Sequence, residues 1–274
     1  MRILRAAVMA GGWAVMAWAT LGQMAGCANL PATSTSASRS DIVTASDETE
    51  QRKRARLRLE LATTYYSQGK YTTALDELKQ AVAIDPTLPS LHEMRGLIYA
   101  AMGDRARAEG SFKDGLAIDP NNGSILHNYA WFLCQEGRYA AADALFERAA
   151  NLPQTIQTSK TLLARGVCQI NAGLYPEAEK TLAKSYEIDP SNPATAYNYA
   201  YVLYRRGELE RARFYIGRVN SVPAQVSAES LWLAARIEQR AGKTAARDKL
   251  IAQLRDQFAG SRQASLAEMG QFDE

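Results

Sequence analysis

One pattern recurs about every 34 residues along most of this sequence, and it predicts a row of similar folding units. Glycines mark the pattern: they stand at positions 69, 103, 137, 173, 207 and 242, at intervals of 34 to 36 residues. A small residue stands seven places before each glycine: Ala62, Gly96, Ala130, Gly166, Ala200 and Ala235. Another follows five places after most of them: Ala74, Ala108, Ala142, Ala178 and Ala212. Small residues at such fixed places indicate that parts of each unit approach too closely there for a large side chain.

Prolines close several of these units. Pro86, Pro120 and Pro190 end the second helix of their hairpins, and Pro153 does so one place early, because proline cannot continue the helical hydrogen-bond ladder. This frame resembles the tetratricopeptide repeat. The resemblance implies an all-α fold, a superhelix (α-solenoid) of about six helical hairpins over residues 52–258. Arg247 replaces the expected alanine in the sixth unit, as a terminal cap would. Residues 259–274 are predicted to form a frayed, polar C-terminal tail.

The first residues carry export signals. Arg2 and Arg5 precede a short apolar run, and the pattern is typical of a secretory signal peptide over residues 1–26. The stretch Met24-Ala25-Gly26-Cys27 resembles the bacterial lipobox, which implies cleavage before Cys27 and lipidation of that residue. Ala28 in the next place favours the outer membrane by analogy with Gram-negative sorting. Residues 27–51, rich in Ser, Thr and Ala, are predicted to tether the folded part to the membrane.

Residues that carry catalysis or bind metals are sparse. The two histidines, His92 and His127, do not have metal-ligand spacing, and no glycine-rich phosphate loop is present. Asp85, Asp119 and Asp189 are better explained as turn residues than as acid–base groups. Net charge is only +3, without a basic patch interleaved with aromatics. We therefore expect a non-enzymatic protein with no metal, cofactor, small-molecule substrate or nucleic-acid partner.

Two cysteines remain once Cys27 is assigned to lipid. Cys134 and Cys168 fall on the first helices of neighbouring units, two places apart in the frame, and an exported domain experiences an oxidising compartment. A disulfide between them is the favoured interpretation, and two buried free thiols are the alternative. A thiol nucleophile paired with His127 is disfavoured, because seven residues on one helix separate the two groups by about 10.5 Å.

Tetratricopeptide arrays usually bind peptides along the concave surface lined by their first helices, and the frame predicts which side chains lie there. The predicted lining consists of Leu59, Thr63, Tyr66, Leu97, His127, Trp131, Val167, Tyr197, Tyr201, Tyr204 and Trp232, with Glu93, Ala100, Leu163, Ile170, Arg236 and Gln239 at equivalent places. This set is apolar and aromatic with few charges, as binding hot spots often are. The alternative is that several of these residues are core between repeats.

Two short signatures narrow the family. The stretches "YAWFLCQEGRY" and "ARGVCQINAG", together with the later "AESLWLAARIEQRAG", resemble the type IV pilus biogenesis and stability lipoproteins, the PilW/PilF-type pilotins. The resemblance implies a protein on the periplasmic face of the outer membrane that binds pilus secretin subunits and promotes their localisation and multimerisation. The alternative function is another lipoprotein scaffold of this repeat class, serving outer-membrane protein assembly or cell-wall enzymes.

Overall fold

The computed structural model describes residues 48–153 and 155–272. The predicted signal peptide, Cys27 and most of the predicted tether lie outside these residues. Within the described ranges every regular element is a helix, which confirms the all-α fold. None of these helices is long and apolar enough to span a bilayer.

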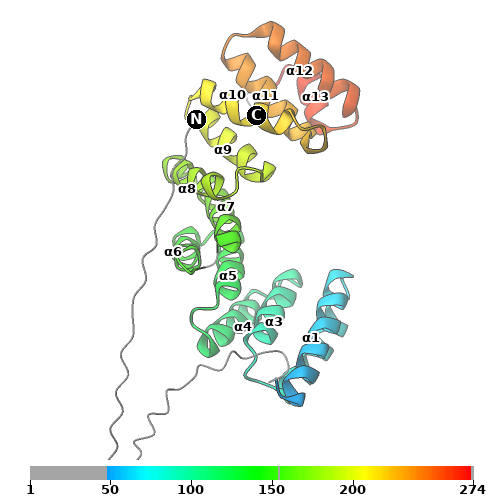
Figure 1. The fold of residues 1–274 in the computed structure, drawn as a ribbon. Coiled ribbons are helices and arrows are strands. Elements are labelled where there is room, and N and C mark those ends of the chain that lie inside the picture. The colour runs from blue at the N-terminus through cyan, green and yellow to red at the C-terminus, as the bar shows by residue number, and fades with distance from the viewer. Residues whose placement is uncertain (1–47, 154, 273–274) are drawn as a thin grey trace, which may run out of the picture. The chain divides into compact units, whose positions relative to one another are not determined.

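Six helical hairpins follow one another along the chain (Figure 1). They pair α1 (Glu50–Ser67) with α2 (Tyr71–Ile84), α3 (Pro89–Ala101) with α4 (Arg105–Ile118), α5 (Gly123–Gln135) with α6 (Tyr139–Ala150), α7 (Thr155–Asn171) with α8 (Tyr175–Ile188), α9 (Pro193–Arg205) with α10 (Leu209–Asn220), and α11 (Ala228–Arg240) with α12 (Thr244–Gln257). A single 3₁₀ turn, Pro223–Gln225, lies between α10 and α11. The helical boundaries thus follow the 34-residue frame.

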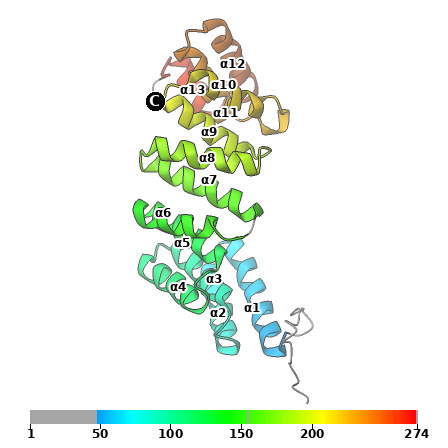
Figure 2. The same cartoon turned by 60° about the vertical axis from the view of Figure 1, so that its left-hand side comes forward.

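The hairpins stack in sequence order (Figure 2). Each first helix from α1 to α9 contacts the next first helix, ending at α11, and each second helix from α2 to α10 also contacts the first helix that follows it. The first helices therefore form one continuous layer, and a surface on that layer can extend across several repeats.

The turns are built by two residue types at fixed places. The glycine between the two helices of each hairpin has φ between 72° and 82°, a left-handed conformation that side chains disfavour. Between hairpins, the side chains of Asp85, Asp119 and Asp189 accept hydrogen bonds from the backbone N–H two residues later. This confirms their role as turn residues and explains why an aspartate recurs at this place.

The small residues mark the places where the two helices of a hairpin meet. A Cβ atom added at Gly166 would lie 2.5 Å from Cγ of Leu182, and one added at Gly96 would lie 2.8 Å from the Phe112 ring. A large side chain stands on the second helix sixteen places after each small residue of the first helix. These partners are Leu78, Phe112, Phe146, Leu182, Ile216 and Ile251, and all are buried. The core is therefore a line of large-against-small contacts, one for each repeat.

The structure differs from the expectation for residues 259–274. Instead of a frayed tail, residues Arg262–Glu268 form α13, which packs on α11 and α12. Ser261 caps its first turn by accepting a hydrogen bond from the Ala264 N–H, and Ala264, Leu266 and Ala267 are buried in the last core cluster. The polar composition of this stretch hid a short amphipathic helix, because three buried residues among seven are enough to anchor about two helical turns.

Candidate partner-binding face

The layer of first helices presents most of the predicted lining on one surface, which we call the first-helix face. It is defined by Leu59, Thr63, Tyr66, Leu97, His127, Trp131, Val167, Tyr197 and Tyr201, which are partly buried or, for Thr63, exposed. These residues come from α1, α3, α5, α7 and α9, so the face extends over five repeats. Partly exposed apolar side chains in a continuous row provide contact area for a protein partner.

Polar groups on this face are engaged with one another. On α3, Glu93 Oε1 accepts hydrogen bonds from Ser124 Oγ and from Asn128 Nδ2 at 2.6 Å, both on α5. Thr63 Oγ1 donates to the backbone carbonyl of Leu59 at 2.8 Å. Because these contacts satisfy the acid and the hydroxyl within the protein, the face offers mainly apolar and aromatic contacts.

The centre of the face is built around His127 and Trp131. His127 Nδ1 lies 3.0 Å from Thr161 Oγ1 on α7, and its ring meets Phe146 edge-on at 5.8 Å between centroids. Burial lowers the pKa of His127, so the imidazole is neutral at pH 7. Trp131 packs partly buried against the core cluster of the second and third repeats. His127 therefore serves packing between repeats and is not a base directed at a thiol.

Two tyrosines of the first-helix face, Tyr197 and Tyr201, lie on α9. Burial raises the pKa of Tyr197, and the nearby Glu229 raises it further, so the Tyr197 phenol stays protonated near neutral pH. Tyr201 Oη accepts a hydrogen bond from Arg205 Nη1 at 2.8 Å, and the Arg205 guanidinium also lies 4.7 Å from the centre of the Tyr175 ring. Tyr197 and Tyr201 keep partly exposed ring surface and remain candidate contact residues.

Two predicted lining residues belong to the interior instead. Tyr204 is 6% exposed, because the guanidinium groups of Arg236 and Arg240 cover its ring at 5.1 and 5.5 Å. Trp232 is also 6% exposed, because the ring of Phe272 stacks on it at 5.1 Å between centroids. The repeat frame identified the correct helix face for both residues, but other side chains cover that face locally.

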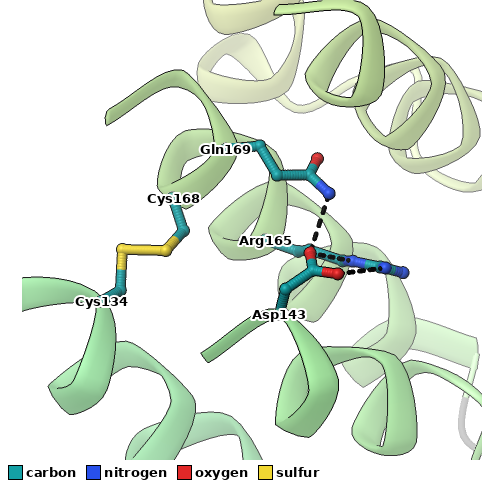
Figure 3. Close-up of a disulfide and its surroundings, with 5 residues drawn as sticks. All are labelled: Cys134, Asp143, Arg165, Cys168 and Gln169. Atoms are coloured by element: carbon teal, nitrogen blue, oxygen red, sulfur yellow. Dashed lines mark hydrogen bonds and ion pairs between the residues drawn. A yellow bond between two sulfur atoms is a disulfide. The ribbon is translucent and has the colours of Figure 1, made fainter. Parts of the chain in front are cut away.

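Cys134 and Cys168 are joined as a disulfide between α5 and α7 (Figure 3). Their Cα atoms are 5.8 Å apart, and each residue is 3% exposed. This arrangement links the first helices of the third and fourth repeats covalently. Both sulfurs are thus used in a buried crosslink.

Comparisons with known proteins identify the family. A model described as TPR repeat matches residues 62–103, and a model described as tetratricopeptide repeat matches residues 99–166 and 169–237. The chain belongs to the tetratricopeptide repeat family. Proteins of this family are typically interaction scaffolds, not enzymes.

The tetratricopeptide proteins that are similar to this chain include type IV pilus assembly and biogenesis proteins. The type IV pilus assembly protein PilF of Pseudomonas aeruginosa is 24% identical over 157 residues, which are 57% of this chain and 62% of that protein. The crystal structure of PilW, described as a widely conserved type IV pilus biogenesis factor, superposes with a TM-score of 0.70 at 27% identity. The superposition covers 78% of this chain and 97% of the PilW chain. The structure of P. aeruginosa PilF superposes with a TM-score of 0.69 at 22% identity, and the match covers 81% of this chain and 100% of the PilF chain.

The tetratricopeptide hairpins are joined by ionic contacts that the sequence analysis missed. They involve the residue directly after the small residue of the second helix. Asp143 binds Arg165 through both carboxylate oxygens at 2.8 Å and also accepts from Gln169 (Figure 3). Arg213 binds Glu238 at 2.6 and 2.9 Å. Each contact reaches from a second helix to the first helix of the next repeat.

The same place holds acids in two other repeats. Glu109 accepts from Tyr129 at 3.0 Å and pairs with Arg138 at 2.6 Å, and the Arg138 hydrogen bond lowers the pKa of Glu109 to about 2. Glu179 pairs with Arg206 and Arg211 of the fifth repeat. A charged residue recurring at one frame position, beside a small residue, is the sequence signal that could have revealed this series.

Proposed function

We propose that this chain is a non-enzymatic, lipid-anchored assembly factor of the type IV pilus, which binds subunits of the pilus secretin through the first-helix face. Two observations support the partner. The sequence similarity to PilF covers 57% of this chain and the fold similarity to PilW covers 78% of it, and both proteins are named for pilus assembly or biogenesis. The two cysteine signatures that resemble the pilotins lie at the centre of the first-helix face.

The single observation that carries the binding role is the continuity of this face. Its aromatic and aliphatic side chains lie on five adjacent first helices, and the acid beside them on α3, Glu93, is bonded to Ser124 and Asn128. A surface of this kind suits an apolar segment of a partner, laid along the row as an extended strand or an amphipathic helix. Binding would depend on buried aromatic anchors and would show little salt dependence.

The proposed anchor is the lipid on Cys27, with the residues from 28 up to the start of α1 at Glu50 as the tether. Several acyl chains would hold the protein at the outer membrane, since each buried methylene contributes about 0.8 kcal/mol. Tethering would turn capture of a second secretin subunit into a nearly intramolecular event and so favour multimerisation. In this proposal the lipid provides the location and the repeats provide the recognition.

The binding surface is tested by a double substitution. We expect Trp131→Ala with Tyr201→Ala to weaken binding of purified secretin about 10- to 100-fold, because aromatic anchors commonly contribute about 2 kcal/mol or more. The measurement is surface plasmon resonance, with circular dichroism to verify the fold. Phe214→Ala is the matched control, since Phe214 is an aromatic residue that is 58% exposed on the second helix α10. Equal losses in both proteins, or none in the double variant, would rule out the first-helix face.

The anchor is tested separately in cells. Cys27→Ala should move both this protein and the secretin away from the outer membrane, while the purified variant still binds secretin with unchanged affinity. Membrane fractionation followed by immunoblotting measures the distribution. Normal secretin localisation in cells that express only Cys27→Ala would remove the lipid from the proposal.

A further inference from the structure

The segment Met269–Phe272, directly after α13, covers part of the sixth repeat. The Phe272 ring stacks on Trp232, and the Phe272 carbonyl oxygen accepts a hydrogen bond from Arg236 Nε at 2.8 Å. Trp232 and Arg236 hold the same places on α11 that Tyr197 and Tyr201 hold on α9. The chain's own aromatic residue therefore lies on the continuation of the first-helix face.

The contacts to Phe272 are those a protein would make to a bound peptide. The Trp232 indole stacks on the Phe272 ring, and the Arg236 guanidinium donates a hydrogen bond to the main-chain carbonyl. A second guanidinium, that of Arg247, lies 5.7 Å from the centre of the Phe272 ring. Arg247 is the residue that replaces the expected alanine of the repeat frame, so the departure of the sixth repeat from the frame contributes directly to this site.

The backbone of this segment is bonded to the end of α13, whereas the Phe272 ring contacts Trp232 on α11. The backbone N–H groups of Gly270 and Gln271 donate to the Ala267 and Leu266 carbonyls at the end of α13, and Phe272 N donates to Gly270 O. Met269 is 61% exposed. The helix α13 has three buried residues of its own, Ala264, Leu266 and Ala267, in the core cluster against which Phe272 also packs. Phe272 can thus leave Trp232 by rotation of a short segment, without unfolding α13.

We propose that Trp232, Arg236 and Arg247 form a binding site for an aromatic side chain of an extended partner peptide, and that Phe272 occupies this site until the partner displaces it. The inference rests on the proposed binding role of the first-helix face and extends that face to the sixth repeat. The peptide supplies an aromatic ring for Trp232 and Arg247 and a main-chain carbonyl for Arg236. Because Phe272 competes intramolecularly, at an effective concentration on the order of millimolar, it lowers the apparent affinity of any external ligand.

The test uses a labelled synthetic peptide of residues 266–274, "LAEMGQFDE", added to the full-length protein and followed by fluorescence anisotropy. We expect Phe272→Ala protein to bind this peptide at least about tenfold more tightly than wild-type protein. The same peptide with alanine in place of phenylalanine should bind neither. Met269→Ala protein is the matched control and should behave like wild type, because Met269 is exposed in the same segment.

Two further variants separate an occupied binding site from a purely structural cap. Arg236→Gln, introduced together with Phe272→Ala, should reduce peptide binding because it removes the donor to the carbonyl. Phe272→Leu keeps an apolar residue over Trp232 and should give an affinity between those of wild type and Phe272→Ala. Equal peptide affinity for wild-type and Phe272→Ala proteins would overturn the proposal. A Phe272→Leu protein that is as stable as wild type but binds the peptide no more tightly than wild type does would also overturn it. No secretin is present, so failure here is distinct from failure of secretin binding to the first five repeats.

Discussion

Replacing Cys168 with serine should lower the free energy of unfolding of the oxidised protein by about 3–4 kcal/mol. The disulfide closes a loop across a sequence separation of 34 residues. Such a crosslink restricts the unfolded chain, and a loop of this size corresponds to about 3–4 kcal/mol in the chain-entropy model. Since the two cysteines join consecutive repeats, the bond also holds together the two hairpins that carry Trp131 and Val167.

Urea denaturation followed by circular dichroism measures this effect. Cys134→Ser and the double variant should match Cys168→Ser, because removal of either sulfur removes the same crosslink. Wild-type protein treated with dithiothreitol should approach the stability of the variants. If reduction leaves the urea midpoint of wild type unchanged, the disulfide does not contribute, and the two buried free thiols become the better description.

Replacing Arg213 with methionine should cost about 3 kcal/mol of stability. The Glu238 carboxylate is buried on α11, with its side chain only 9% exposed, and Arg213 on α10 contacts both of its oxygens. Loss of the arginine leaves a carboxylate without its partner in the contact between the fifth and sixth repeats, and removing one partner of a buried ion pair commonly costs 3–5 kcal/mol. We place the value near the lower end, because Arg213 itself is 25% exposed.

The second substitution Glu238→Leu should restore most of the loss caused by Arg213→Met. Replacing both charges with apolar side chains removes the desolvation cost along with the attraction, and such exchanges are often neutral. Lys53→Met is the exposed control: its pair with Glu50 lies on the surface, so its loss should change stability by less than about 1 kcal/mol. A double variant less stable than Arg213→Met alone would show that Glu238 has another stabilising role.

The fold followed from the sequence because the repeat determines helix positions, turns and close contacts together. Gly166 and Leu182 illustrate this: the small residue is visible in the frame, and its large partner lies at a constant offset. The disulfide was one of two open interpretations, since frame positions place two cysteines on neighbouring helices but do not give the direction of their side chains.

The candidate site was harder to predict, because its accessibility depends on residues from other repeats and from outside the frame. Tyr204 is covered by Arg236 and Arg240 of the next repeat. Trp232 is covered by Phe272, which is 40 residues later in a stretch whose composition suggested a tail. The ionic contacts of Asp143 and Arg213 were missed for a related reason: a charged residue on a helix is normally assigned to solvent until its neighbour in space is known.

Site-specific photocrosslinking in cells tests the central claim most directly. A photoreactive p-benzoylphenylalanine is placed either at Val167, on the first-helix face, or at Phe214, on the second helix α10, and cells carrying the pilus secretin are irradiated. Mass spectrometry then identifies the crosslinked partner. The account predicts a secretin adduct from position 167 and none from position 214. Secretin adducts from position 214 alone, or from neither position in cells that assemble the secretin normally, would contradict it.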